Sequence, residues 1–297
     1  MNQYYTKLTF FMLIAMLLWG GGWTALKILT EVATLEVVIF WRFFIMFLAF
    51  FPILFVLKSS LKVSKKSLVF IFASSVLNIL FMVFAFLGVH YGQAGSGGVI
   101  ITTLSPLFTV VFVNIFFKKP FAKKELIGLA IGVFGGLIML GIFTEQNMLQ
   151  VFSTGNFYYL LAALVWAVVT LLSQKSHLHI HPVIYSFYIS GVATVILLFL
   201  TMHQDLGMIF DQDLSFWVSL LYLAVLGQTV ATTIYFYASG KLGSAKASSF
   251  MFVVPLSALL ISHIILDEPI KIAVLVGGSL SILAIYFINK TRLNQAK

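Results

Sequence analysis

The feature that most limits the fold of this chain is a series of long apolar runs separated by short polar segments. A helix rises ~1.5 Å per residue, so about 20 apolar residues cross the ~30 Å hydrocarbon core of a bilayer. Ten runs have about this length, at residues 8–28, 36–57, 67–87, 97–117, 125–143, 157–174, 184–202, 214–238, 247–266 and 272–288. They are continuous, whereas the strands of a membrane barrel alternate apolar and polar residues. The sequence therefore predicts an all-α integral membrane protein with ten transmembrane helices.

Composition indicates the same class. Hydrophobic residues make up 61% and charged residues 9% of the 297 residues, and a soluble domain needs a more charged exterior than this. The net charge of +9 does not indicate nucleic acid binding, because the basic residues lie at the ends of apolar runs and not on one solvated face. We expect a lipid bilayer and a small-molecule substrate as partners and no nucleic acid, and a homo-oligomer stays open. Disulfides are excluded, since the chain has no cysteine.

The positions of the basic residues predict an orientation. With a cytoplasmic amino terminus, fifteen of the 18 basic residues fall on the inner side: Lys7, Lys58, Lys62, Lys65, Lys66, Lys118, Lys119, Lys123, Lys124, Lys175, Lys241, Lys246, Lys290, Arg292 and Lys297. Glu31 follows the first run closely, without a small-residue cleavage site, so we expect this run to remain as a span. We expect a multi-pass protein of the cell (inner or plasma) membrane. The positive-inside rule then predicts that both termini lie in the cytoplasm.

The chain also repeats itself. Residues 95–120 and 243–269 share a plan of small residues, an apolar run with a central proline, and a terminal proline. Pro106 corresponds to Pro255 and Pro120 to Pro269, each 149 residues later. This offset divides the ten runs into two five-helix repeats, residues 1–144 and 155–290, followed by a cytoplasmic tail at 291–297.

An odd number of helices in each half inverts the second repeat. The first break, Lys118-Lys119-Pro120, is basic, whereas its counterpart Asp267-Glu268-Pro269 is acidic, as expected for corners that face opposite sides of the membrane. Inverted repeats place a substrate site near the bilayer midplane and permit alternating access. Pro106 and Pro255 are expected to bend symmetry-related helices around that site, or else to form passive packing kinks.

The sequence resembles the drug/metabolite transporter superfamily, EamA type, over essentially its full length. The resemblance lies in Trp19-Gly20 followed by Lys27, in Arg42, and in the small residues, central proline and acidic-proline ending of residues 247–269. It departs at Lys119, where the family usually has glutamate, and at Gly21-Gly22, which replace a polar pair. Membership implies ten helices, no ATP-hydrolysing partner, and frequent export of amino acids or other small metabolites.

Arg42 is the formal charge that lies well inside an apolar run. A charged side chain at the bilayer centre costs about 2.5–3.5 kcal/mol on insertion scales, so Arg42 is expected to face the helix bundle or to extend toward the interface. Two roles are open: an ion pair with Glu31 or Glu36, or the binding of a substrate carboxylate by two parallel hydrogen bonds.

Aromatic and uncharged polar side chains within the runs are the other candidates. Trp19 and Trp23 share a helical face and either line a pocket or pack near a membrane boundary, and the glycines between them permit close helix approach or local bending. Hydroxyl and amide groups either contact substrate or bridge helices, and most phenylalanines are expected to face lipid or core. The candidate substrate-binding residues are Trp19, Trp23, Arg42, Asn78, Thr102, Thr103, Trp166, Thr170, Gln228, Thr232, Tyr235 and Ser249.

Other classes are less well supported. The sequence has no HExxH motif, so we expect neither an enzyme nor a bound metal or cofactor, and His177, His179 and His181 are interpreted as loop residues. The repeat favours alternating access over a channel. No carboxylate lies deep in a run, so a facilitator or exchanger fits as well as a proton antiporter. The sequence predicts a secondary transporter of a small neutral or zwitterionic metabolite, with amino acid export as the leading interpretation and amines, nucleosides or drugs as alternatives.

Overall fold

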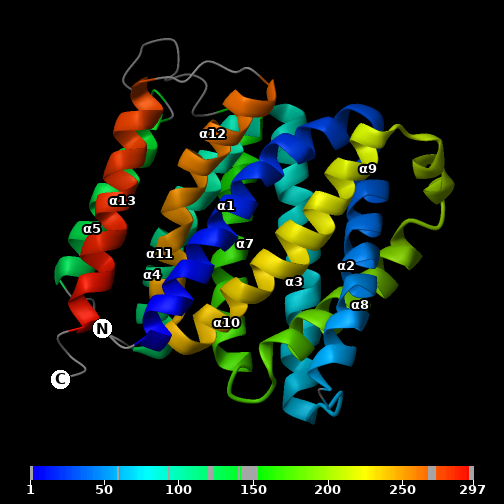
Figure 1. Ribbon diagram of the computed structural model, residues 1–297, viewed down its shortest axis with the longest axis horizontal. Helices are drawn as coiled ribbons and strands as arrows, with labels where there is room; N and C mark the ends of the chain where they lie inside the picture. Colours follow the sequence, from blue (N-terminus) through cyan, green and yellow to red (C-terminus); the bar gives the residue numbers. More distant parts are fainter. Residues whose placement is uncertain are drawn as a thin grey trace.

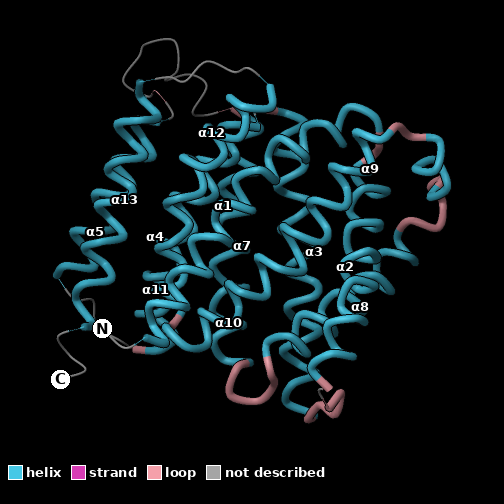
Figure 2. The backbone as a smooth tube through the Cα atoms, viewed as in Figure 1, coloured by secondary structure: helices cyan, strands magenta, loops and turns pink. Residues whose placement is uncertain are grey.

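The computed structural model describes residues 3–58, 60–92, 94–118, 123–139, 141, 153–266 and 272–293. These residues form a bundle of long helices, with no strand among them (Figures 1 and 2). The helices of the first half are α1 (Gln3–Val32), α2 (Leu35–Leu57), α3 (Lys65–Tyr91), α4 (Ala94–Phe117) and α5 (Lys123–Met139). Those of the second half are α7 (Thr154–Ser176), α8 (Pro182–Leu200), α9 (Leu214–Leu221), α10 (Thr233–Leu242), α11 (Ser244–Ser249), α12 (Val254–Leu266) and α13 (Ile272–Leu293).

Each of the ten predicted runs is helical over nearly all of its described length, with turns at Gly141 and at Thr201 and Met202, which confirms the all-α prediction. Within the described residues, seven helices are long and apolar enough to cross a membrane, and Glu125–Met139 and Leu275–Ile288 are shorter apolar helices. The eighth run is one continuous rod in which the π-helix Tyr222–Thr232 joins α9 to α10. The ninth run is divided, because a 3₁₀ turn, Phe250–Val253, separates α11 from α12.

The two central prolines lie in different local structures. Pro106 is inside the continuous helix α4, whereas Pro255 follows the 3₁₀ turn and is the second residue of α12. Proline has no N–H and is tolerated in the first turn of a helix, where that donor would have no helical partner. The bend expected at both prolines stays a prediction. The charged breaks at 119–120 and 267–269 lie outside the described residues.

The sides of the bundle are strongly apolar. Phe55 is 85% exposed, and Phe72, Val195 and Phe199 are each more than half exposed. Conversely, Ser and Thr side chains are common in the interior, where most of them bond to carbonyl oxygens of their own or neighbouring helices. An apolar exterior of this kind is rare in monomeric soluble proteins and fits a hydrocarbon environment.

Helices from the first half of the chain pack against helices from the second half. Helix α5 packs along α13 at one edge of the bundle, and α2 packs along α8 (Figure 1). Helix α7 contacts α3 and α4, while α1 contacts the rod of α9, π-helix and α10 and also α12. The start of α1 and the end of α13 lie at the same end of the bundle (Figure 1), as an even number of crossings requires.

Candidate functional site

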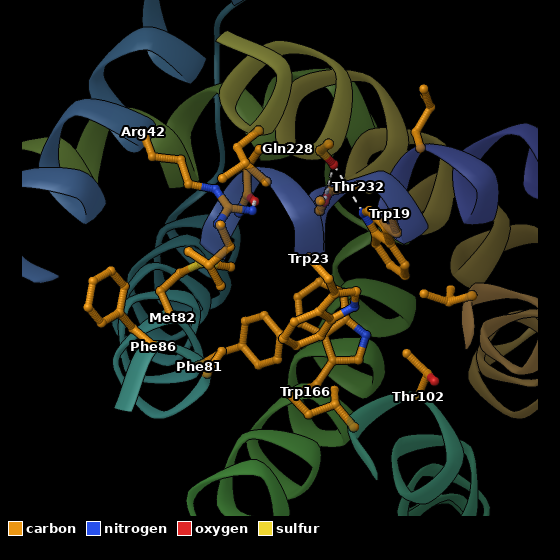
Figure 3. Close-up of a pocket in the computed structure, with 18 of the residues that line it drawn as sticks. Trp19, Trp23, Arg42, Phe81, Met82, Phe86, Thr102, Trp166, Gln228 and Thr232 are labelled. Atoms are coloured by element: carbon orange, nitrogen blue, oxygen red, sulfur yellow. Dashed lines mark hydrogen bonds between the residues drawn. The ribbon is translucent and has the colours of Figure 1, made fainter. Parts of the chain in front are cut away.

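A cavity opens inside the bundle, between α1, α2, α3, α4, α7 and the π-helix (Figure 3). We call it the central cavity; its empty space is about 820 Å³, including the part that is open to the outside. Its walls are mostly aliphatic and aromatic: Leu18, Trp19, Gly22, Trp23, Leu26, Val38, Ile39, Arg42, Phe81, Met82, Ala85, Phe86, Ile101, Thr102, Trp166, Leu223, Gly227, Gln228, Thr232, Met251 and Val254. A mostly apolar wall with a few polar groups is typical of a small-molecule site.

Arg42 supplies the formal charge of this wall. Its guanidinium extends from α2 into the cavity (Figure 3), where Nη2 donates a hydrogen bond to Oε1 of Gln228 at 3.0 Å. The Nε–H group is buried and has no acceptor among the described residues. Of the two roles that the sequence left open, the ion pair is not formed, because the described residues show no ion pair between Arg42 and Glu31 or Glu36.

Gln228 has its position because the π-helix interrupts the regular helix in the middle of the eighth span. In this segment the Thr229 and Thr232 hydroxyls donate to carbonyl oxygens five residues earlier, those of Ala224 at 2.9 Å and Gly227 at 3.2 Å. π-Helical segments are rare and frequently occur at functional sites. Here the segment gives Gly227, Gln228 and Thr232 to the cavity wall.

Trp19 connects α1 to this π-helix. Its indole Nε1 donates a hydrogen bond to the Gly227 carbonyl oxygen at 3.0 Å. Its ring lies edge-on to Trp166, with centroids 5.3 Å apart, and 5.0 Å from the ring of Tyr235. The second tryptophan of the pair, Trp23, projects into the middle of the cavity (Figure 3).

The glycines between the two tryptophans allow close packing. A Cβ atom on Gly20 would lie 2.7 Å from the backbone nitrogen of Ala258 in α12. A Cβ atom on Gly21 would overlap the side chain of Tyr222, whose hydroxyl donates to the Leu18 carbonyl at 2.9 Å. Helix α1 is continuous through these residues. Of the two expected roles, close helix approach is therefore the one observed.

Part of the predicted site lies beneath the cavity. Tyr235 is fully buried, and its hydroxyl is 2.9 Å from that of Thr170, which in turn donates to the Trp166 carbonyl at 2.8 Å. Nearby, the hydroxyls of Ser74 and Tyr185 form a short hydrogen bond. These buried hydroxyls bond to one another and to the backbone and do not line the cavity.

Seven of the twelve candidate residues line the cavity: Trp19, Trp23, Arg42, Thr102, Trp166, Gln228 and Thr232. The other five do not: Asn78, Thr103, Thr170, Tyr235 and Ser249. Asn78 lies one turn before Met82 and donates to the Ser74 carbonyl at 2.7 Å. Ser249 donates to the Lys246 carbonyl at 2.8 Å, and Thr103 packs against Gly136 of α5. Some hydroxyl and amide groups in these spans therefore donate hydrogen bonds to backbone carbonyl oxygens, while others line the cavity.

The sequence reasoning missed the aromatic wall formed by α3. Phe81, Met82, Ala85 and Phe86 all line the cavity, and the Phe81 ring is 4.7 Å from that of Trp166. The expectation that phenylalanines face lipid or core did not anticipate Phe81 and Phe86. The spacing of Phe81, Ala85 and Phe86 places them on one face of the helix, but many other apolar residues in the sequence have the same spacing, so it does not identify a cavity wall. Among the described residues, no group of three His, Asp or Glu side chains is arranged to hold a metal ion.

The fold and the cavity together define a polytopic helical membrane protein with a mostly apolar cavity inside its bundle. The sequence model of the EamA-like transporter family matches the chain twice, at residues 6–141 and 153–290. The chain therefore belongs to the EamA-like transporter family, and the resemblance to the drug/metabolite transporter superfamily is confirmed.

Several of its relatives are named as transporters. An uncharacterized transporter of Synechocystis sp., sll0355, is 29% identical over 71% of this chain and 68% of its own length. The uncharacterized transporter YoaV of Bacillus subtilis is 25% identical over 89% of this chain and 90% of its own length. A solved crystal structure of a protein with 14% sequence identity has the same fold, with a TM-score of 0.73 over 96% of this chain and 98% of the other.

Proposed function

We propose that this protein exports amino acids from the cytoplasm by alternating access, with the central cavity as the substrate site. The observation that carries the proposal is the Arg42 guanidinium, which faces the cavity with a buried Nε–H that has no acceptor among the described residues. A carboxylate is the anion whose two oxygens match the guanidinium donors. The aromatic walls formed by Trp19, Trp23 and Trp166 suit an apolar side chain.

The helix packing supports the inverted-repeat part of the proposal. If residues 1–144 and 155–290 are equivalent, α1 corresponds to α7, α3 to the α9–α10 rod, and α4 to α11 and α12. The contacts of α7 with α3 and α4 then have counterparts in the contacts of α1 with the rod and with α12. An interface between two such halves can close on one side while it opens on the other. The contacts below Trp166 would close one side in this conformation.

Charge supports the proposed orientation. One end of the bundle holds the connection between α2 and α3, which includes Lys62, and the start of α3, with Lys65 and Lys66. Helices α7 and α10 finish at the same end, close to Lys175 and Lys241 (Figure 1). By the positive-inside rule, we expect this end of the bundle and both termini to lie on the cytoplasmic side of the cell membrane.

The test is a counterflow assay with purified protein in liposomes and a panel of labelled amino acids. We expect at least one aliphatic or aromatic amino acid to exchange, and Arg42→Ala to reduce the exchange by at least tenfold. Trp217→Phe, outside the cavity, is the matched control and should leave exchange unchanged. Failure of every amino acid, together with full exchange of another solute by Arg42→Ala, would falsify the proposal.

A further inference from the structure

The charges around the central cavity are unbalanced. Arg42 contributes a positive charge, and no carboxylate side chain is present among the described residues that line the cavity. Gln228, its hydrogen-bond partner, is neutral. The remaining polar side chains of the wall are hydroxyls and indoles. A substrate with one negative charge would therefore make the occupied cavity neutral, whereas a zwitterion would leave it positive.

The Arg42 side chain has donors available for such an anion. A guanidinium carries five N–H donors, and Gln228 accepts one of them. The Nε–H has no acceptor among the described residues and is buried. A buried donor without a partner is costly, and more so when it belongs to a charged group. Binding a carboxylate would supply that acceptor and pair the charge in the same step.

An α-ammonium group would find no comparable partner. Its strongest partner in a protein interior is a carboxylate, which the described cavity wall lacks. The neutral oxygens of Thr102, Thr232 and Gln228 can accept hydrogen bonds and the tryptophan faces offer cation–π attraction, but neither neutralises the ammonium charge. The ammonium would also lie in the same apolar cavity as the positive charge of Arg42, where repulsion is poorly screened.

We infer that the central cavity recognises its ligand through one carboxylate and an aromatic or branched apolar body, and that an α-amino group weakens binding, so that an amino acid binds less tightly than the monocarboxylate of the same shape. This inference rests on the proposed function for the location of the site, but it narrows the chemistry of the ligand. The carboxylate pairs with Arg42 beside Gln228. The apolar body lies against Phe81, Phe86 and Trp23, which face the same space (Figure 3).

The test uses three ligands with the same phenyl ring and similar chain length. 3-Phenylpropionate carries the carboxylate alone, phenylalanine carries both groups, and 2-phenylethylamine carries the amine alone. Binding to the purified full chain in lipid nanodiscs is measured at pH 7.4 by calorimetry, with empty nanodiscs subtracted. We expect 3-phenylpropionate to bind at least fivefold more tightly than phenylalanine, and 2-phenylethylamine to show no saturable binding.

Two variants locate the effect at the cavity. Arg42→Gln should weaken 3-phenylpropionate binding at least tenfold. Gln228→Glu keeps the arginine but places a carboxylate next to it, so it should weaken 3-phenylpropionate and improve 2-phenylethylamine. This second variant tests the inference if Arg42→Gln does not fold, and Trp217→Phe is the control that should match the wild type.

The outcomes separate the inference from the proposed function. Tighter binding of phenylalanine than of 3-phenylpropionate, with the loss on Arg42→Gln retained, overturns the inference and leaves amino acid transport supported. Tighter binding of 3-phenylpropionate, without transport of any amino acid, supports the inference and overturns the amino acid proposal. If 3-phenylpropionate binds and neither Arg42→Gln nor Gln228→Glu changes its affinity, Arg42 has no role in binding, and both the inference and the proposed function are overturned at this point.

Discussion

The indole Nε1 of Trp19 donates a hydrogen bond to the carbonyl oxygen of Gly227 at 3.0 Å, across 208 residues of sequence. This bond joins α1 of the first half to the π-helix of the second half at the wall of the central cavity. Any movement of the two halves that separates α1 from the π-helix must break it. The bond is therefore one of the contacts that hold the present conformation.

Removing this bond should destabilise the protein moderately. Trp19→Phe retains an aromatic ring against Trp166 and Tyr235 but lacks the N–H donor. We expect a loss of about 0.5–1.5 kcal/mol, the net value of one hydrogen bond. Thermal unfolding in detergent should show a lower midpoint than that of Trp217→Phe, a tryptophan that packs against Phe210 and Phe216. Equal midpoints for the two variants would contradict a stabilising role for the bond.

The approach of α1 to α12 predicts different effects at two nearby glycines. A methyl group on Gly20 would meet the backbone of Ala258, which cannot move aside easily, so Gly20→Ala should cost about 1–3 kcal/mol. At Gly22 the nearest atom is the end of the Leu223 side chain at 3.2 Å, so Gly22→Ala should be close to neutral. Thermal midpoints measure both. A fall at Gly22→Ala as large as that at Gly20→Ala would show that helix approach is not the cause.

The contact below the cavity predicts a modest loss in Tyr235→Phe. The ring would still pack against Trp19 and Trp166, while the hydroxyl bond to Thr170 would be lost. The weak contact of the hydroxyl with the Met251 sulfur at 3.8 Å would be lost as well, while Thr170 keeps its bond to the Trp166 carbonyl. We expect about 1 kcal/mol of destabilisation, measured by thermal unfolding against Tyr91→Phe, which removes a hydroxyl from an exposed side chain. A destabilisation above about 3 kcal/mol would indicate a larger network than this.

His177, just after the end of α7, predicts a pH dependence. Burial, assisted by the nearby charges of Lys241 and His181, lowers its pKa below the ordinary value of 6.5, and Nδ1 has no acceptor or donor partner among the described residues. The folded protein therefore binds this proton less readily than the unfolded chain. Stability is full above pH 6.5 and declines as the pH falls through 6.5 toward the lowered pKa.

The measurement compares thermal midpoints at neutral and mildly acidic pH. The wild type and His203→Gln, a change in an exposed histidine, should both lose stability on acidification. His177→Gln has no proton to gain at this position, so its midpoint should fall by less. If His177→Gln declines as steeply as the wild type, other groups account for the pH dependence.

Much of the fold could be predicted from the sequence, because hydropathy and run length are local properties. The ten apolar runs, their helical structure and the family were all predicted correctly. The division of the ninth run at Phe250–Val253 and the π-helix at Tyr222–Thr232 were not. Both depend on hydrogen bonds and packing with other helices, such as the Trp19 bond to Gly227, and composition does not record these contacts.

The candidate site was only partly predictable, for a related reason. A charge in an apolar run is costly, so Arg42 was expected to face the helix bundle or to extend toward the interface, and the structure places it at the cavity. Its partner was not, because Gln228 is 186 residues away and reaches Arg42 through the π-helix. Asn78 was selected as a polar side chain, yet the cavity begins one turn further along α3, at Phe81 and Met82.

The sequence by itself therefore determined the class of protein, its helices and the charge available for recognition. Only the tertiary structure decided which faces of α1, α3 and the π-helix line the cavity. The physical reason is that transfer into a bilayer depends on the residues of one segment, whereas the rotation of each helix depends on how it packs against segments far away in the chain.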